Sequence, residues 1–526
     1  MRAHLMHRDR DFLNALTAAD LQAGRTRGWR EVFDLPVALP WNEQVLTQDL
    51  ELNTLFRAMA AEDEFLFDVA RKAILSGLQN DPDTIRYRQE IAKDCLKNPG
   101  VIRQMYALTV EAIEAKRKHY ISFFGRFPGT TLHEAIEAMQ IFVDMLHRLR
   151  TIAEEHAGRF ESEGFTTLFA MLERELSDEY FARIKRHLLD LRFREGVLLS
   201  VELGKDNESI NHGLRKAGKR PSLLKRILGK GPPAYTVVIA DRDETGAKYL
   251  SELRDRGINL VANALAQSSD HIQSFFEMLR AELGFYVGCL NLHGRLASRG
   301  ETICFPRPEP ASARRLRFAG LYDVCLVLTM DRGVVANTIG ADGKSLVIIT
   351  GANQGGKSSF LRAVGLAQLM MQCGMFVGAE SFDGELCTAL FTHYKREEDP
   401  TMKSGKFDEE VGRMSDIVEH ITPHSMLLLN ESFSSTNERE GSEIARQIVS
   451  ALLEKGVKIF CVTHLFEFAH GCLDRKIENA LFLRAERKAD GTRTFRLIEG
   501  EPLETSYGED LYREVFAAPP GVAKAG

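Results

Sequence analysis

An eight-residue segment in the second half of the chain has the composition of a phosphate-binding loop. Residues 351–358 read Gly-Ala-Asn-Gln-Gly-Gly-Lys-Ser and fit the pattern G-x-x-x-x-G-K-[ST]. Glycines let backbone N–H groups turn toward phosphate oxygens, the lysine reaches the outer phosphates, and the serine hydroxyl is a magnesium ligand. A chance glycine-rich turn is the alternative, but an apolar run at 346–350 and a helical segment from Phe360 give the strand-to-helix context that the pattern requires. We expect the nucleotide to contact Gly351, Ala352, Asn353, Gln354, Gly355, Gly356, Lys357, Ser358 and Ser359.

A second segment, MLLLNESF at 426–433, places polar side chains directly after an apolar run. Four apolar residues followed by an acid are typical of a buried strand that delivers a carboxylate to a nucleotide site. However, Asn430 occupies the place where an aspartate usually holds magnesium, and the acid that follows it is Glu431. The segment therefore leaves two alternatives, ATP hydrolysis and ATP binding alone.

Two styles of sequence surround these segments. From about residue 49 to 199 there is almost no strand signal, and apolar residues recur at helical spacing. Examples are Leu52, Leu55, Phe56 and Met59. Helical periodicity resumes at about 268–297, and from about residue 302 short β-branched runs alternate with helices. The fold class that we expect is a long-helix domain followed by an α/β domain.

Composition is that of a folded protein with several domains. The chain has 526 residues, 44% of them hydrophobic and 27% charged, and a formal net charge of −6. This charge excludes a wholly basic nucleic-acid-binding chain, so a polyanion site must be a local patch. Charges interrupt every apolar run of the N-terminal segment, and no segment approaches the ~20 apolar residues of a membrane span, which predicts a cytoplasmic protein. Eight cysteines without a Cys-x-x-Cys pair argue against zinc and disulfides, and small buried apolar residues are the better interpretation.

One local basic patch stands out between residues 211 and 233. Seven cations occur there with no acid among them, and glycines and prolines close the segment as a loop. They are Arg215, Lys216, Lys219, Arg220, Lys225, Arg226 and Lys230. Two interpretations remain open: a solvated loop, and a cationic tip that contacts DNA phosphates.

Several further segments, in order along the chain, carry a resemblance to a known family. Residues 350–358 closely resemble the TGPNxGGKS loop of the MutS family of DNA mismatch-repair ATPases. The segments at 374–379, 434–441, 461–467 and 506–508 are similar to its G-x-[FY]-V-P-A, serine-threonine, A-T-H-[YF]-x-E-L and S-Y-G-I motifs, respectively. The resemblance covers about 334–515, whereas the first half shows only helical character and a fragment at 83–89.

For the fold, the resemblance implies lever-like helices joined to an ABC-type P-loop ATPase. We expect an N-terminal extension at 1–40, a helical core and lever domain at 41–300 with the basic tip at 211–233, and an ATPase domain at 301–526. In the family two chains form a dimer, and ATP lies between one phosphate loop and the partner's signature segment. That segment corresponds here to residues 404–410, with Ser404, Gly405, Phe407 and Glu410 as its candidates.

For the chemistry, the resemblance implies ATP and Mg²⁺ as ligands. Glu431, His464 and Lys357 match the catalytic positions, Ser358 and Asn430 the metal positions, and Asn337 the segment that packs on adenine. Asparagine keeps an oxygen acceptor but loses a negative charge, so magnesium affinity should fall while catalysis need not vanish. We therefore expect a slow, magnesium-requiring ATPase, with a nucleotide-binding protein without turnover as the alternative.

Departures from the family pattern shape the expected role. Only about 40 residues precede the helical core, which predicts that a mismatch-reading module is missing, and the chain ends within 20 residues of Tyr507. The Phe-Phe-Glu triplet at 275–277 is better interpreted as core than as an intercalating ring. We expect a dimeric, ATP-gated clamp that binds duplex or branched DNA without sequence preference, in repair or recombination. An ATP-gated protein-interaction scaffold is the alternative.

Three smaller signals concern single residues or short segments of the α/β half. His393 is better interpreted as a structural histidine than as a metal ligand. Glu380 is either a nucleotide-sensing residue or a solvated acid, and the two interpretations are balanced. No aromatic residue occurs at 334–337, so stacking on adenine should be weaker than usual.

Overall fold

A computed structural model describes most of the chain. The described residues are 4–6, 39–119, 127–194, 196–205, 208–216, 235–240, 242–330, 333–396, 405–488 and 490–503. They form two compact units. Unit 1 comprises Arg103–Phe160 and Phe165–Arg280, and unit 2 comprises His4–Ile102, Glu161–Gly164 and the chain from Ala281 onward.

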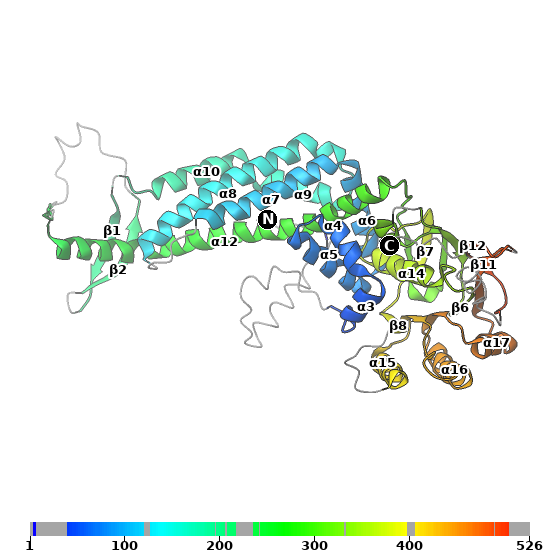
Figure 1. Cartoon of the computed structure of the whole chain (residues 1–526). Helices are drawn as coiled ribbons and strands as arrows, with labels where there is room; N and C mark the ends of the chain where they lie inside the picture. The colour runs from blue at the N-terminus through cyan, green and yellow to red at the C-terminus, as the bar shows by residue number, and fades with distance from the viewer. Residues whose placement is uncertain are drawn as a thin grey trace, which may run out of the picture. The chain divides into compact units, whose positions relative to one another are not determined.

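Unit 1 consists mainly of long helices (Figure 1). They are α7 (Pro99–His119), α8 (Pro128–His156), α9 (Glu163–Glu175), α10 (Asp178–Asp190) and α12 (Glu244–Ala297), with η2 (Ala157–Arg159) between α8 and α9. A stripe of buried apolar residues runs along α8, and Phe142 on α8 stacks on Phe276 on α12 with ring centroids 5.9 Å apart. Phe275 is buried as well. The expected core role of the Phe-Phe-Glu triplet is therefore confirmed.

Two expectations for this half were wrong. Strands β1 (Leu198–Leu203) and β2 (Ser209–Arg215) form an antiparallel hairpin where helix and loop were expected. The hairpin packs on α12 at Gly257, where an added Cβ would lie 2.2 Å from Leu199. In addition, α12 begins at Glu244 and not near residue 268. Its first turns are mostly exposed, so they lack the apolar stripe that would reveal a helix.

Unit 2 begins with short helices that pack beside the sheets. They are α3 (Glu43–Asp49), α4 (Leu52–Ala60), α5 (Glu64–Ser76), η1 (Gly77–Gln79) and α6 (Pro82–Lys97). Asp63 caps α5 through the N–H groups of Phe65 and Leu66, and Asp81 caps α6, which has proline at its first position. The change of sequence style expected near residue 300 falls between α12 and β3. The boundary between the compact units does not follow this change, because α3–α6 pack with the sheets and belong to unit 2.

The main sheet of unit 2 has six strands in the order β12-β11-β6-β10-β9-β8. Five are parallel, and β12 is antiparallel to β11. The strands are β6 (Leu346–Gly351), β8 (Leu390–Tyr394), β9 (Met426–Asn430), β10 (Lys458–Val462), β11 (Ala480–Arg487) and β12 (Arg493–Glu499). The helices that alternate with them are α14 (Lys357–Gln372), α15 (Lys406–His420), α16 (Glu438–Glu454) and α17 (Phe466–Asp474). Because parallel strands end at one edge, residues 351, 430 and 462 meet there.

A second sheet of unit 2 has four strands in the order β3-β7-β4-β5. It is built from β3 (Arg307–Glu309), β4 (Leu316–Leu321), β5 (Asn337–Gly340) and β7 (Ser381–Glu385), with η3 (Ala311–Ala313) and α13 (Val324–Thr329) in its connections. Strand β5 leads to β6, so this sheet positions the segment before the phosphate loop. The expectation of a helical half followed by an α/β half is thus met in its coarse form.

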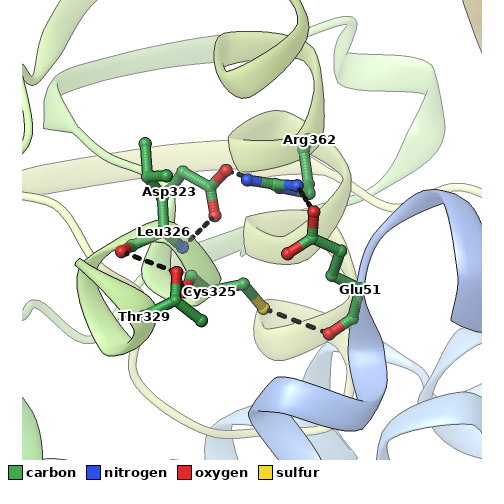
Figure 2. A network of polar contacts seen from close by, with 6 residues as sticks. All are labelled: Glu51, Asp323, Cys325, Leu326, Thr329 and Arg362. Atoms are coloured by element: carbon green, nitrogen blue, oxygen red, sulfur yellow. Dashed lines mark hydrogen bonds and ion pairs between the residues drawn. The ribbon is translucent and has the colours of Figure 1, made fainter. Parts of the chain in front are cut away.

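A polar network ties the helix after the phosphate loop to two neighbouring elements (Figure 2). Arg362 on α14 donates to Asp323, with 2.5 Å between Nε and Oδ2, and also pairs with Glu51 between α3 and α4. Asp323 caps α13 through the N–H of Leu326, and the Cys325 thiol donates to the carbonyl of Glu51. Burial raises the pKa of Asp323, and the charge of Arg362 opposes that shift. The network therefore fixes α14 at its second turn.

The cysteines are placed as the sequence predicted. Seven of the eight are buried and Cys304 is partly buried, so they act as small apolar side chains. Burial raises the pKa of the Cys461 thiol, which keeps it protonated in the core. Among the described residues, no helix combines the length and the apolar character that a membrane crossing requires.

Candidate nucleotide-binding site

The phosphate loop connects the end of β6 to the start of α14. Gly351 and Gly356 have φ of 102° and 86°, a region that favours glycine. An added Cβ at Gly355 would lie 2.6 Å from the Cβ of Ala485 on β11 and 2.8 Å from the carbonyl oxygen of Ala352. The glycines therefore let the loop turn tightly against β11 before Gly356 caps α14. The N-terminus of this 16-residue helix adds partial positive charge beside the loop.

Lys357 is the first residue of α14, and its side chain folds back over the loop. It is only 5% exposed, and its ammonium donates to the carbonyl oxygens of Gly351 and Ala352 at 2.9 Å each. Burial lowers the pKa of Lys357 to about 8, while the charge of Glu431 opposes this shift and that of Arg493 adds to it. The lysine is therefore a buried cation at the loop, and a bound phosphate competes with two carbonyls for it.

The two expected metal-binding side chains are in direct contact. The Oγ of Ser358 on α14 donates to the Oδ1 of Asn430 at the end of β9, over 3.0 Å. Oxygen donors suit Mg²⁺, which usually keeps several waters beside one or two protein ligands. The pair fits such a site, although both donors are neutral. Among the described residues, no group of three or more His, Cys, Asp or Glu residues offers a denser metal site.

Glu431 and His464 form a second polar pair at the same edge of the sheet. The Nε2 of His464 lies 2.9 Å from the Oε1 of Glu431. This hydrogen bond holds the pKa of Glu431 below its usual value, against the opposing effect of burial. Glu431 has a left-handed backbone (φ 55°), which costs about 1–2 kcal/mol. Its N–H donates to the carbonyl of Val462 on β10, so the strand ends fix the carboxylate in place.

The loop after β9 is anchored by a buried histidine. His393 on β8 contacts the Oγ of Ser432 at 2.7 Å through Nδ1 and the carbonyl oxygen of Glu410 at 3.0 Å through Nε2. Because a carbonyl can only accept, Nε2 carries the proton. Burial lowers the pKa of His393 to about 4, and the charge of Arg413 adds to the shift, so the ring is neutral. The expected structural role of His393 is confirmed.

A small cavity of about 140 Å³ lies beside the phosphate loop. It is lined on one side by Val334, Val335 and Asn337, and on the other by Gly356, Ser359 and Phe495. The Oδ1 of Asn337 accepts from the N–H of Leu497 on β12 at 2.7 Å, so its side chain fixes the cavity wall.

Phe495 is an aromatic residue of this cavity that lies outside the segment at 334–337. The segment at 334–337 contains no aromatic residue, but β12 supplies Phe495, which is 47% exposed, to the same cavity. Nothing in the sequence pointed to it, because about 160 residues separate the two walls. Glu380 is exposed and lies against Gly320, which leaves both of its interpretations standing.

Comparison with known proteins identifies the family of the chain. The family model described as MutS2 N-terminal domain matches residues 80–299. The model described as MutS domain V matches residues 347–524, which include Lys357, Asn430, Glu431 and His464. Together the two models match most of the chain. The chain belongs to the MutS family.

Individual relatives agree with the family models. A human protein named MutS protein homolog 4 is 25% identical over 305 residues, which is 56% of this chain and 32% of that protein. The DNA mismatch repair protein MutS of Chloroflexus aurantiacus is 29% identical over 306 residues, or 55% of this chain and 31% of that protein. Endonuclease MutS2 of Thermus thermophilus is 35% identical over 132 residues, or 25% of this chain and 18% of that protein. The chain thus spans about a third or less of these relatives.

The segment expected to act in trans in this MutS relative is only partly described. Ser404 lies outside the described residues, and Gly405 is exposed as the N-cap of α15. Phe407 is partly buried against the apolar core below the sheet. Glu410 is buried, and its carboxylate accepts from the N–H of Phe433 at 3.1 Å. Glu410 therefore anchors α15 to the loop after β9, and Gly405 is the exposed member of the set.

Two of the expected DNA contacts, Arg215 and Lys216, are described and lie in unit 1. Arg215 ends β2, and its Nε donates to the Oγ of Ser200 at 2.9 Å. The side chain of Lys216 is 83% exposed and lies 3.8 Å from a carboxylate oxygen of Asp190. Lys219 and Arg220 fall outside the described residues.

Proposed function

We propose that the chain is an ATP-dependent DNA-binding protein in which an ABC-type ATPase domain opens and closes a dimeric clamp on DNA. One observation carries the proposal: three sets of side chains meet at the ends of β6, β9 and β10. They are Lys357 at the phosphate loop, the Ser358–Asn430 pair and the Glu431–His464 pair. Members of the MutS family are ATPases, and this arrangement supports the same reaction here.

Each group has a distinct task in ATP hydrolysis. The loop and Lys357 bind the outer phosphates, and Glu431, held ionised by His464, polarises the attacking water. Ser358 and Asn430 would hold Mg²⁺, which supplies positive charge to the phosphates. Because Asn430 is neutral, the metal is bound more weakly than by a carboxylate, and turnover is slow.

The exposed N-terminus of α15 supports a composite site. Gly405 caps this 15-residue helix, and its N-terminal N–H groups carry partial positive charge suited to a phosphate. In the proposed homodimer, Ser404 and Gly405 of one chain face the nucleotide on the other. Phe407 and Glu410 hold the segment from within their own chain.

Residues 41–300 are the part that we assign to DNA, and 301–526 the part that we assign to ATP. Exposed cations at the end of β2 support phosphate contacts without sequence preference. The relatives named for DNA mismatch repair support a role in repair or recombination. The alternative is an ATP-gated protein scaffold with little hydrolysis, which the neutral Asn430 and the net charge of −6 favour.

Turnover and assembly can be tested together. Purified protein should hydrolyse ATP slowly with Mg²⁺, and Lys357→Ala should abolish nucleotide binding. Glu431→Ala should retain ATP uncleaved and shift the protein toward dimer in sedimentation, because the composite site stays occupied. Wild-type turnover equal to that of Glu431→Ala would leave only the scaffold. A protein that stays monomeric at saturating ATP yet turns over would contradict the composite site.

A further inference from the structure

Strand β12 carries a bulge directly beside the phosphate loop. Arg487 pairs with Arg493 and Ala485 with Leu497, so β12 takes four residue steps where β11 takes two. Phe495 within the bulge has φ of 59°. Bulges redirect side chains and are frequent beside active sites. Here the bulge lies against the loop, because a Cβ added to Gly356 would be 3.3 Å from the carbonyl oxygen of Phe495.

The bulge is fixed on both sides by hydrogen bonds. The hydroxyl of Thr494 contacts the carboxylate of Glu486 on β11 at 2.8 Å. After the bulge, the N–H of Leu497 donates to the Oδ1 of Asn337, which lines the cavity beside the phosphate loop. These contacts hold the strand in one conformation, so the side chain of Arg493, just before the bulge, has a defined direction.

Arg493 reaches the loop that binds phosphate. Its Nη1 donates to the Oε1 of Gln354 at 3.0 Å, and Gln354 lies within the loop with φ of 55°. Its Nε is buried and has no hydrogen-bond partner among the described residues. Nor does Arg493 pair with a carboxylate in the described part of the chain. A guanidinium with an unused buried donor, next to Lys357, is suited to a phosphate oxygen.

We propose that Arg493 is a second phosphate-binding cation of this site, which contacts the polyphosphate of the bound nucleotide beside Lys357. The inference rests on the proposed nucleotide site and goes beyond it, because it assigns to β12 a role in binding phosphate. The positive charge of Arg493 also offsets the weaker metal binding expected from the neutral Asn430. Where the metal is held weakly, a second fixed cation supplies part of the charge that the polyphosphate requires.

The test compares ligands that differ in phosphate. Binding of ATP, ADP and adenosine to the full chain is measured by calorimetry, with Mg²⁺ and with a chelator. Arg493→Ala should weaken ATP binding by about tenfold or more, a loss typical of a charge-assisted hydrogen bond, and leave adenosine binding unchanged. Arg493→Lys should recover part of the loss. The effect should be larger with the chelator, since the arginine then carries more of the phosphate charge.

Two controls separate phosphate binding from a structural role. Arg475→Ala removes an equal charge where α17 leads to β11, near the strand ends opposite the loop, and should leave ATP affinity unchanged. Arg493→Gln keeps a side chain that can hydrogen-bond to Gln354 but removes the charge, and should lose about as much ATP affinity as Arg493→Ala. Thermal unfolding of each variant reports whether it is folded.

The outcomes are distinguishable. ATP affinity unchanged in Arg493→Ala, or an equal loss for ATP and adenosine, would overturn the role of Arg493 while leaving the proposed function in place. Full ATP affinity in Arg493→Gln would make the arginine a structural clamp that acts through Gln354, which also overturns the inference. Wild-type protein that binds no ATP would overturn the proposed function and this inference together.

Discussion

At the residue scale, Asn430 differs from an aspartate by a single charge. The Oδ1 of Asn430 already contacts the Oγ of Ser358, so the oxygens of both metal positions lie side by side. Geometry is therefore suited to Mg²⁺, and only the electrostatic attraction is reduced. The neutral Asn430 leaves Glu431 ionised, because the low pKa of Glu431 depends on its hydrogen bond with His464.

Restoring that charge should strengthen metal binding. Asn430→Asp is expected to lower the Mg²⁺ concentration for half-maximal ATP turnover by about tenfold, because ligand charge sets cation affinity. A magnesium titration of steady-state ATPase activity measures the effect. The control is Asn437→Asp, which changes the same amide at the N-cap of α16 and should leave the titration unchanged. An unaltered magnesium dependence in Asn430→Asp would place this residue outside the metal's surroundings.

The buried lysine predicts a pH dependence of nucleotide binding. In the free protein the pKa of Lys357 is lowered to about 8, and a bound polyphosphate raises it, so binding takes up a proton above that pH. The affinity for nucleotide should be highest and constant below pH 8, and it should fall as the pH rises beyond that value. Fluorescence titration with a labelled ATP analogue between pH 6.5 and about 9.5 measures this trend. Constant affinity across the range would show that Lys357 stays charged without ligand.

How far single residues could be predicted depended on how local their signals are. The loop, Asn430 and Glu431 follow apolar runs that form strands β6 and β9, so the sequence alone predicted that each lies at the end of a buried strand. Arg493 and Phe495 could not be predicted, because their positions depend on a bulge and on pairing between β11 and β12. Glu410 was a candidate for the signature segment that acts in trans, yet its carboxylate is buried and accepts from the N–H of Phe433.

At the element scale, the network around Arg362 decides how α14 is held. Its guanidinium pairs with two carboxylates of very different exposure: the side chain of Asp323 is 1% exposed and that of Glu51 is 46% exposed. Buried pairs lose much when one partner is neutralised, whereas exposed pairs contribute little. Arg362 therefore allows a buried and an exposed ion pair of the same cation to be compared.

Neutralising the buried partner should destabilise unit 2 strongly. Asp323→Asn keeps an N-cap for α13 but removes the charge that balances Arg362, and should lower the free energy of unfolding by about 3 kcal/mol. Glu51→Gln, the control, should cost less than about 1 kcal/mol. Urea denaturation followed by circular dichroism measures both. Equal effects of the two substitutions would show that burial does not govern this network.

Elements were predictable where one face is apolar. Strands β6 and β9 are buried along their length and were expected from their apolar runs. The hairpin of β1 and β2 escaped prediction because its residues are largely exposed, with Leu203 77% exposed. Such strands gain little from burial, so their sequence carries no strong alternation.

At the scale of the whole molecule, the nucleotide site and the expected DNA contacts belong to different compact units. The site lies in unit 2, and the hairpin with Arg215 and Lys216 lies in unit 1. Helices α7 and α12 each contribute residues to both units. The proposed clamp therefore predicts two separable properties, ATP turnover without DNA and DNA binding through unit 1.

The basic segment allows these properties to be separated. Lys216 and Asp190 form an exposed pair at 3.8 Å, which contributes little and leaves the cation able to contact phosphate. Replacing Arg215, Lys216, Lys219 and Arg220 with alanine should weaken binding to all DNA sequences alike. The slope of log affinity against log salt should flatten by roughly 0.9 for each DNA phosphate that the variant no longer neutralises. ATP turnover without DNA should stay at the wild-type rate.

A matched variant shows whether position or total charge matters. Arg174, Arg183, Lys185 and Arg186 are exposed on α9 and α10 of the same unit. Their replacement by alanine removes the same charge from another surface. It should change the salt slope less than the alanine variant of the four basic residues at 215–220 does. Fluorescence anisotropy on duplex, branched and single-stranded DNA over a range of salt gives the slopes. Identical slopes for the wild type and the variant at 215–220 would remove this segment from the DNA site. A wild-type protein that does not bind DNA would favour the protein scaffold.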